Sequence, residues 1–291
     1  MHRFAHLAQR LYNTPLAIHP RKMEIIAAAL GERLGITRLL RADGTAVVAF
    51  DGDDDDWFAR ERPSRDDHGY DLLAGVAVLP ITGTLVQKLG TMRPYSGMTG
   101  YDGIRSSFFA ALADPAAAAI ALDIDSPGGE CAGLFDLADA LYAARGAKPV
   151  WAILSENAYS AAYALASTAD KITVPRTGGT GSIGVVTMHV DLSRALNEAG
   201  ITVRIVRSGE RKMEGNQFEP LTEGALGRVQ ADIDTMAEMF FATVARNRGV
   251  SADAVQAMQG GTFLGAEGVA AGLADAVLAP DQAFGLLAGL D

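Results

Sequence analysis

The sequence predicts an α/β domain with largely parallel strands, preceded by a small helical amino-terminal appendage. Short apolar runs alternate along most of the chain with segments in which apolar residues recur at helical spacing. Several of these runs are apolar throughout, as strands buried on both faces of a sheet are. The chain has 291 residues, of which 49% are hydrophobic and 21% are charged. This composition allows a sizeable core and excludes disordered, collagen-like and fibrous proteins.

The amino-terminal appendage is expected over residues 1–50, where a short strand at 47–50 follows a helical stripe. The apolar residues of this stripe are Met23, Ile26, Leu30 and Leu34. Residues 51–71 contain nine acidic residues against three Arg, a net charge of −6, and few aliphatic side chains. This composition favours a solvated linker, so the main domain is expected to begin at about residue 72.

The main domain alternates strands and helices. The expected strands are residues 75–81, 118–124, 149–154, 171–174, 184–190 and 201–206. The expected helices are one through Ile104, Phe108 and Leu112, one through Leu134, Leu137 and Leu141, one at residues 160–169, and a long amphipathic one that begins near Thr222. In such domains the functional site usually lies in the loops at the carboxyl ends of the strands.

Composition excludes several classes of site and partner. The single Cys cannot form an intramolecular disulfide, and four of the five His lie before residue 70, so no metal site or cofactor is expected. The first twenty residues lack a signal peptide, and the longest apolar stretch, residues 116–122, is far below the ~18 residues that span a bilayer. Of the net charge of −10, only about −4 lies outside the acidic stretch. We therefore expect no membrane anchor, no nucleic-acid partner and a cytoplasmic location.

The first candidate loop is Asp125–Gly129, which lies between a buried strand and a helix. Two glycines after a rigid proline let backbone N–H groups point outward at the head of the helix. There they can stabilise a developing oxyanion. A tight turn between strand and helix explains the same residues without any chemistry.

The second candidate is Ser160, which lies where a strand ends and a run of helix formers begins. The helix dipole would support a nucleophilic hydroxyl at this point. Serine is also a frequent N-cap residue, and the two roles are not exclusive.

The third candidate is the glycine-rich segment 179–184, which matches the pattern G-x-G-x-x-G. A dinucleotide site would need a helix directly after the glycines, whereas residues 185–190 have the β-branched composition of a strand. We interpret the segment as a strand edge near a cleft, where an extended peptide binds along Gly181, Ile183 and Gly184.

A hydroxyl nucleophile needs a base, and the sequence offers two kinds. His189 is the only His after residue 68, but a lone His within an apolar run is more often a packed residue. Among the five lysines, Lys212 lies in a loop-like segment after a strand. It could act as a base if burial lowered its pKa from ~10.4 towards 7, which costs about 4 kcal/mol. A solvated surface charge is the usual role of a lysine, and Cys131 is better explained as a packed side chain than as a nucleophile.

Five motifs occur in a fixed order along the chain. They are Asp-Ser-Pro-Gly-Gly at 125–129, Tyr-Ser-Ala-Ala-Tyr at 159–163, Thr-Gly-Ser-Ile-Gly-Val at 180–185, Ser-Gly-x-x-Lys at 208–212, and Gly-x-Ala with Gly-Leu-Ala-Asp near the end. In this order they resemble the signal peptide peptidase A (protease IV) family of serine peptidases over residues 72–280, which leaves 281–291 as a tail. The phrases LYNTPLAIHPRKMEII, IALDIDSPGGE and KPVWAILSENAYSAAYALAS resemble the bacteriophage branch of this family, the prohead or minor capsid proteases.

The resemblance implies a ClpP/crotonase-like fold and a Ser/Lys dyad, with Ser160 as nucleophile and Lys212 as general base. It further implies that Ser182 hydrogen-bonds the lysine ammonium and orients it. The backbone N–H groups implied to hold the oxyanion are those of Gly128, Gly129 and Ala161.

The resemblance also implies the partners. Substrates would be extended peptides bound by strand addition, with small or apolar side chains beside the cleaved bond. In the phage branch they are capsid, portal or scaffold precursors inside the prohead, in the cytoplasm of the bacterial host. Family members assemble into homo-oligomeric rings, so Lys212 and Ser160 could meet across an interface.

Three other functions use the same residues differently. The chain could be a cytoplasmic signal-peptide or peptide-degrading protease with the same dyad. It could be a non-catalytic capsid or portal-binding component, although every motif residue is present. Acyl-CoA chemistry on the same fold would use the oxyanion loop but has no need of a Ser/Lys pair.

Overall fold

The computed structural model describes residues 14–23, 26 and 68–290. An eight-stranded sheet forms its centre. Six strands follow one another in the spatial order β11, β10, β8, β6, β3 and β2; β9 pairs with the first half of β8, and β12 pairs with β9. The strands are β2 (Asp71–Leu73), β3 (Val76–Thr82), β6 (Ala119–Ser126), β8 (Val150–Tyr159), β9 (Lys171–Val174), β10 (Gly179–Gly181), β11 (Thr262–Leu264) and β12 (Ala276–Val277). Only β2 and β11 run antiparallel to their neighbours, which confirms a largely parallel α/β sheet.

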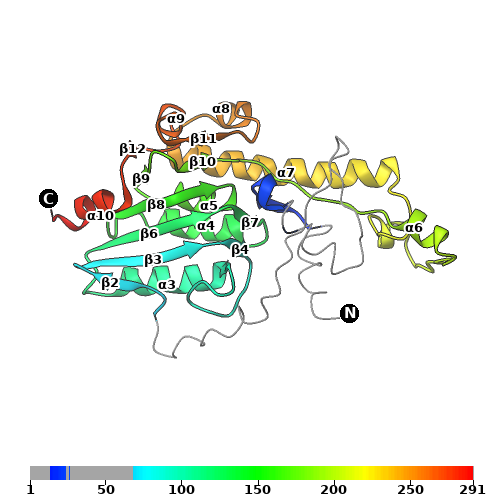
Figure 1. Cartoon of the computed structure of the whole chain (residues 1–291), viewed down its shortest axis with the longest axis horizontal. Coiled ribbons are helices and arrows are strands. Elements are labelled where there is room, and N and C mark those ends of the chain that lie inside the picture. Colours follow the sequence, from blue (N-terminus) through cyan, green and yellow to red (C-terminus); the bar gives the residue numbers. More distant parts are fainter. Residues whose placement is uncertain (1–13, 24–25, 27–67, 291) are drawn as a thin grey trace.

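Strand β8 has two different neighbours on one side. Its first half pairs with β9, in the register Trp151 to Lys171, and its last residues pair with β10, in the register Tyr159 to Gly181. On its other side β8 pairs with β6, and this register shifts between Ile124 and Ser126. The carboxyl ends of β6 and β8 therefore lie side by side, as Figure 1 shows.

A second, four-stranded sheet lies at these carboxyl ends. Its strands in spatial order are β1 (Leu16–Ile18), β7 (Gly128–Glu130), β4 (Thr84–Val86) and β5 (Met98–Gly100). Strand β4 follows β3 and strand β7 follows β6 almost without a break, so the small sheet is built directly on the ends of the large one.

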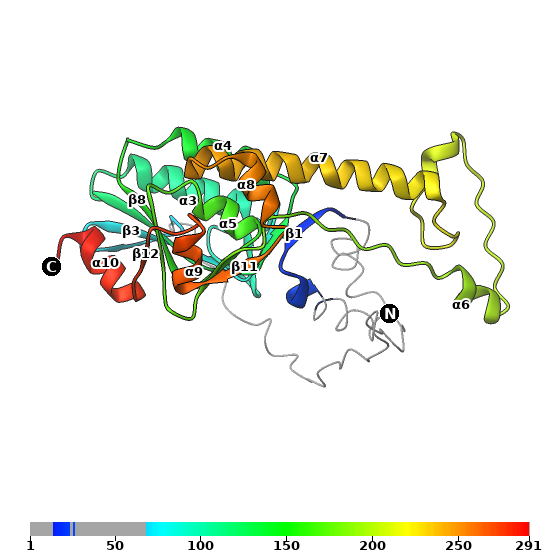
Figure 2. The same ribbon diagram turned by 90° about the horizontal axis from the view of Figure 1, so that it is seen from above.

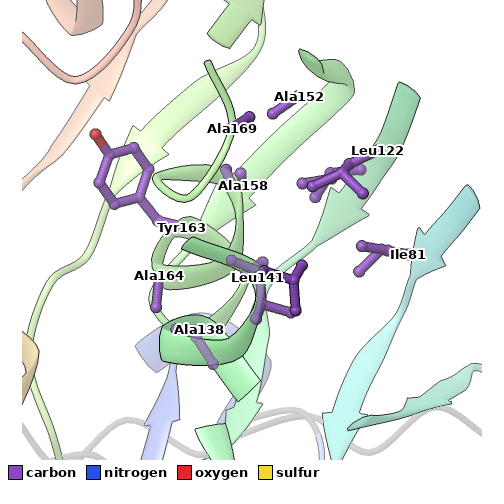
Figure 3. Close-up of a cluster of buried hydrophobic side chains, with 14 of the residues drawn as sticks. Ile81, Leu122, Ala138, Leu141, Ala152, Ala158, Tyr163, Ala164 and Ala169 are labelled. Atoms are coloured by element: carbon purple, nitrogen blue, oxygen red, sulfur yellow. The ribbon is translucent and has the colours of Figure 1, made fainter. Parts of the chain in front are cut away.

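Both faces of the large sheet are buried, because successive side chains along a strand point to opposite faces and both sets are apolar. On β6, Ile120 and Leu122 point into the main core, and Ala119 and Ala121 point to the opposite face. Each of these four residues is at most 5% exposed. Figure 3 shows small residues of β8 and of the helix that follows it, among them Ala152, Ala158 and Ala164, in the same buried cluster as Leu122. The continuous apolar runs therefore reflect burial on both faces.

Helices cover both faces. On the main face lie α3 (Tyr101–Ala113), α4 (Leu134–Ala143), α5 (Ala161–Ala166) and α7 (Glu223–Arg248). The long helix α7 begins where the sequence predicts, because the side chain of Thr222 accepts a hydrogen bond from the Ala225 N–H. Its carboxyl-terminal half packs on the core through Phe240 and Val244, whereas Leu226 near its start is 53% exposed.

Residues 182–222 leave the sheet and run along α7 to its far end; we call this segment the arm (Figures 1 and 2). It contains α6 (Ser193–Glu198) and the 3-10 helix η2 (Glu210–Met213). The strands predicted at 184–190 and 201–206 are wrong: neither segment is a strand in the structure, and only Val186 forms an isolated bridge. Their β-branched side chains have the composition of strands, but in the described chain Val186 bridges a single residue, Leu16 of the small sheet, and residues 201–206 pair with no strand. Val206, for example, is 91% exposed.

Both ends of the described chain contact the domain. Strand β1 pairs with β7, and helical residues follow it at 20–23 and 26. The rest of the expected appendage and most of the acidic linker lie outside the described residues. At the other end, residues 280–288, most of the expected tail, form α10 (Pro280–Ala288), which covers the second face of the sheet through Ala283, Phe284 and Leu287. No described helix combines the length and apolar character that crossing a membrane requires.

Candidate active site

Ser160 lies at the junction of β8 and α5 and has an unusual backbone. Its φ is +55°, in the left-handed region that non-glycine residues rarely adopt, and the residue is 1% exposed. The Ser160 N–H donates to the Gly181 carbonyl at 2.8 Å, which fixes the turn. Although Ser160 occupies the N-cap position of α5, its side chain makes no capping hydrogen bond. The hydroxyl is therefore left for another use.

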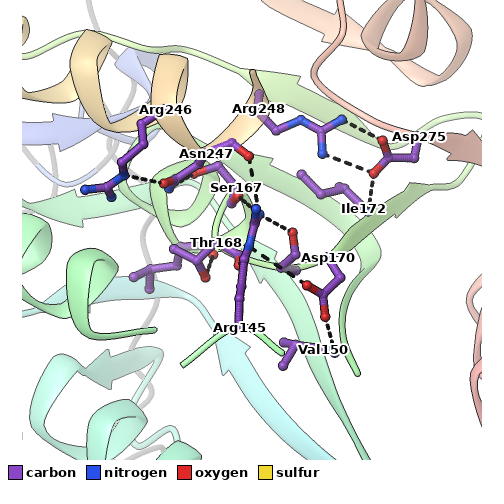
Figure 4. Close-up of polar contacts among 12 residues, drawn as sticks. Arg145, Val150, Ser167, Thr168, Asp170, Ile172, Arg246, Asn247, Arg248 and Asp275 are labelled. Atoms are coloured by element: carbon purple, nitrogen blue, oxygen red, sulfur yellow. Dashed lines mark hydrogen bonds and ion pairs between the residues drawn. The ribbon is translucent and has the colours of Figure 1, made fainter. Parts of the chain in front are cut away.

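The helix that follows Ser160 is held rigidly. All six residues of α5 are buried, and four of them are alanines that let the helix approach the sheet closely. Beyond its end, the Arg145 guanidinium donates to the carbonyls of Ser167 at 3.0 Å, Thr168 at 2.7 Å and Asn247 at 3.3 Å (Figure 4). A cation at a helix carboxyl terminus satisfies its free carbonyls and favours its dipole. Sequence analysis missed Arg145, because nothing near it in the sequence marks this contact.

The two glycines of the first loop form strand β7, beside Ser160. A Cβ at Gly129 would lie 1.8 Å from the Leu85 carbonyl oxygen, so only glycine fits between β7 and β4. Gly128 has a φ of +97°, and its N–H donates to Ser126 Oγ at 3.1 Å. Ser126 in turn donates to the Gly83 carbonyl at 2.7 Å. The Gly128 N–H, one of the three expected oxyanion donors, is therefore already engaged, and sequence analysis missed the role of Ser126.

The other two expected donors lie close to each other. The position of an ideal Cβ on Gly128 is 2.9 Å from the Tyr159 carbonyl oxygen and 3.0 Å from the Ala161 nitrogen, the two atoms that bracket Ser160 in the chain. Ala161 is the first residue of α5, and its N–H has no acceptor among residues 14–23, 26 and 68–290. The peptide from Gly128 to Gly129 thus adjoins the free amide at the start of α5, as an oxyanion site requires.

Gly181 belongs to β10, and β10 is not an edge. It pairs with β8 on one side and with β11 on the other, so the prediction of a substrate edge is wrong for Gly181. The reason is β11, a short strand from the carboxyl-terminal part of the chain that apolar patterning did not reveal. Ile183 and Gly184 lie beyond the paired residues, and in the described chain their backbones form no hydrogen bond.

Ser182 follows Gly181 and is therefore brought beside Ser160. Its φ is +54°, it is 6% exposed, and its N–H donates to the Gly261 carbonyl at 2.7 Å. Of the five described non-glycine residues with positive φ, Ser160 and Ser182 are the two that are buried. Strain of this kind is concentrated at functional sites.

Lys212 is not brought to Ser160 within one chain. It lies in η2 on the arm and is exposed, and its side chain makes no hydrogen bond or ion pair with any residue in the described ranges. In both views the arm ends at the far end of α7, away from α5. A lysine that acts as a general base needs a buried environment, and this chain alone does not provide one for Lys212.

The alternative bases and nucleophiles have other surroundings. Lys148 donates to the carbonyls of Ala111 and Asp114, and Lys171 lies 4.3 Å above the Trp151 ring. Burial raises the pKa of the Cys131 thiol to about 12, which keeps it protonated and unreactive. His189 lies on the arm, and within the described chain it does not hydrogen-bond Ser160. The same part of the chain holds no cluster of three metal-ligating side chains.

Comparison with known proteins identifies relatives with named functions. The sequence profile of peptidase family S49 matches residues 143–290, just over half of the chain. The chain is 40% identical to the head-tail preconnector protein GP5 of Enterobacteria phage P21, over 98% of this chain and 57% of that protein. It is 36% identical to the capsid assembly protease C of Escherichia phage lambda, over 93% of this chain and 62% of that protein. A match to protease 4 of Haemophilus influenzae is 26% identical and covers 81% of this chain and 37% of that protein. The chain thus spans less than two thirds of the length of these relatives.

Proposed function

The chain belongs to peptidase family S49 and has the ClpP/crotonase-like fold of that family, and from this premise we propose that it is a serine endopeptidase. Ser160 is the proposed nucleophile and Lys212 the proposed general base. The observation that carries the proposal is the surroundings of Ser160: a buried, strained serine whose hydroxyl caps nothing, beside the amides of Gly129 and Ala161. A hydroxyl next to paired amide donors at a helix start is the arrangement that acyl transfer requires.

In the proposed reaction the neutral Lys212 amine takes the Ser160 proton as the hydroxyl oxygen attacks the substrate carbonyl. The N–H groups of Gly129 and Ala161 stabilise the negative charge that develops on the carbonyl oxygen. The lysine ammonium then returns the proton to the leaving amine, the C–N bond breaks, and the acyl group stays on Ser160. Water hydrolyses this ester by the same proton path, while Ser182 orients the ammonium.

We propose that the dyad forms between copies of the chain in a homo-oligomeric ring. Lys212 is exposed at the end of an arm that reaches away from its own Ser160, which supports this assignment. The arm and α7 also expose apolar side chains that an interface would cover. They are Ile201, Val203, Val206, Leu226 and Met239, between 42% and 91% exposed.

The proposed substrates are capsid, portal or scaffold precursors, cleaved inside the prohead in the bacterial host. The support is the two phage relatives, which are named a capsid assembly protease and a head-tail preconnector protein and are more similar to this chain than the bacterial protease 4 is.

The test is cleavage of purified precursors. We expect the protein to produce new termini, detected by mass spectrometry, and the variants Ser160→Ala and Lys212→Ala to cleave at least about a thousandfold more slowly. Ser155→Ala and Lys88→Ala, at exposed positions outside the site, are the matched controls and should cleave normally. Cleavage that survives Ser160→Ala or Lys212→Ala would overturn the assignment of the dyad.

A further inference from the structure

Strand β1 is held by hydrogen bonds on both of its sides, directly beside the candidate oxyanion loop. On one side the N–H and the carbonyl of Leu16 each bond Val186 at 2.8 Å. On the other side His19 N–H donates to the Pro127 carbonyl at 2.8 Å, and the Pro15 carbonyl accepts from Cys131 N–H at 3.3 Å. The chain between these contacts runs fully extended across the active-site end of the domain.

The register of β1 places one carbonyl at the oxyanion donors. Ala17 lies opposite Gly129 in the antiparallel pair with β7. Because the pairs two residues to either side are hydrogen-bonded, the alternation of an antiparallel ladder makes Ala17 and Gly129 a hydrogen-bonded pair as well. The ideal Cβ position on Gly128 is 2.3 Å from the Ala17 carbonyl oxygen and 3.0 Å from the Ala161 nitrogen, so this oxygen lies in the neighbourhood of the second donor without accepting a hydrogen bond from it.

The side chains of β1 match those expected of a substrate. Ala17 is 0% exposed, and the aliphatic residues Leu16 and Ile18 on either side are each 4% exposed. The His19 ring packs against Tyr159, the residue before Ser160, with ring centroids 4.9 Å apart. A small residue between two aliphatic ones therefore fills the place where an extended peptide would present its carbonyl to Ser160.

We propose that β1 is a built-in pseudosubstrate: it occupies the substrate-strand position, presents the Ala17 carbonyl to the Gly129 N–H beside Ala161, and closes the site until a substrate displaces it. This inference rests on the proposed function, because it takes Ser160 as the nucleophile. The peptide bond after Ala17 is flanked by hydrogen bonds that hold the chain in place: Leu16 bonds Val186 before it, and His19 bonds Pro127 after it. An amine released from it would remain in place, which favours resealing over cleavage.

The test displaces β1 and measures access to position 160 without relying on catalysis. Ser160→Cys, in a Cys131→Ala background, is labelled with iodoacetamide, with and without Leu16→Arg. A charged side chain at this buried position should detach β1 from β7, so we expect labelling of position 160 to become at least about tenfold faster. The matched control is Leu72→Arg on the outer strand β2, where the side chain is 44% exposed and labelling should not change. A peptide copy of residues 13–23, added to the Leu16→Arg protein, should slow labelling again.

A second readout separates this proposal from the proposed function. With Ser160 and Cys131 intact, Leu16→Arg should raise hydrolysis of a fluorogenic peptide by about the same factor, and the mass of the native chain should stay unchanged. Faster labelling without hydrolysis in any variant would support the pseudosubstrate and refute the peptidase. Hydrolysis with unchanged labelling would refute the pseudosubstrate and leave the peptidase standing. A new amino terminus at Ile18 would also overturn the proposal, because β1 would then be a substrate.

Discussion

The positive φ of Ser160 and Ser182 distinguishes these residues from the other serines of the described chain that are buried. Each such backbone costs about 1–3 kcal/mol and persists only where its surroundings enforce it. Here the enforcement comes from two hydrogen bonds, Ser160 N–H to Gly181 and Ser182 N–H to Gly261. The strain therefore fixes two neighbouring hydroxyls in place on the sheet.

Gly129 provides a test of the oxyanion loop at the scale of one residue. A Cβ there would lie 1.8 Å from the Leu85 carbonyl oxygen, so Gly129→Ala must push β7 away from β4. We expect a loss of stability of about 1–3 kcal/mol in thermal unfolding, together with a loss of peptide hydrolysis. Gly227→Ala, on α7 where a Cβ meets nothing within 4 Å, is the control. Wild-type stability and hydrolysis in Gly129→Ala would contradict the close packing of the loop.

Individual residues could be predicted from the sequence where the motif itself holds the information. The sequence predicts that Ser160 lies where a strand ends and a helix begins, and the structure has β8 and α5 there. The prediction that a helix directly follows the two glycines is wrong, because they form β7 and α4 begins at Leu134. The engagement of the Gly128 N–H by Ser126 could not be foreseen, since it depends on Gly83, which approaches only in the folded chain.

At the scale of elements, apolar patterning predicts the segments that pack in the core of the domain, but not whether an apolar segment has a strand to pair with. The strands around β3, β6, β8 and β9 and the helices α3, α4 and α7 lie close to their predicted positions. The strands predicted at 184–190 and 201–206 do not form, because within the described residues Val186 is the one position of these segments that pairs with a strand, through its bridge to Leu16. The prediction of an edge at β10 is wrong for a different reason: its neighbour β11 is only three residues long, too short for apolar patterning to reveal.

The ion pair between Arg248 and Asp275 links the end of α7 to the sheet. Arg248 Nη2 lies 2.7 Å from Asp275 Oδ1, and Asp275 Oδ2 accepts from Ile172 N–H at 2.7 Å (Figure 4). Burial opposes the charge, but the hydrogen bonds from the Arg248 guanidinium and from Ile172 outweigh it, so the pKa of Asp275 is lowered. A lowered carboxyl pKa stabilises the fold above the unfolded-state pKa, and this contribution is lost as the pH falls through the folded-state pKa.

We therefore expect Asp275→Asn to lower the free energy of unfolding by about 2 kcal/mol at neutral pH. The difference from the wild type should shrink below about pH 4, because the wild-type carboxyl is then protonated as well. Urea denaturation at pH 7 and pH 3 measures both values. Asp232→Asn, at an exposed position on α7, is the control and should have little effect at either pH. An equal penalty at the two pH values would argue against the ion pair as the cause.

At the scale of the whole molecule, the chain separates its candidate nucleophile from its candidate base. Ser160 lies in the rigid α/β domain, and Lys212 lies on an arm beyond the far part of α7, a helix of about 39 Å. The order of the motifs along the sequence predicts which residues belong to the site, but not which copy of the chain supplies each one. The sequence also predicts an appendage and a tail outside the main domain, whereas β1 and α10, which lie in these two segments, both pack on that domain.

Complementation between two inactive variants tests the central claim, that Ser160 and Lys212 act together across copies of the chain. Ser160→Ala and Lys212→Ala chains, carrying different tags, are co-expressed, and the mixed assembly is purified through both tags and assayed with a peptide substrate. We expect each variant alone to be inactive and the mixed assembly to show about a quarter of the wild-type activity, since that share of random pairings joins an intact serine to an intact lysine. An inactive mixed assembly beside an active wild type, or activity in either variant alone, would contradict the account.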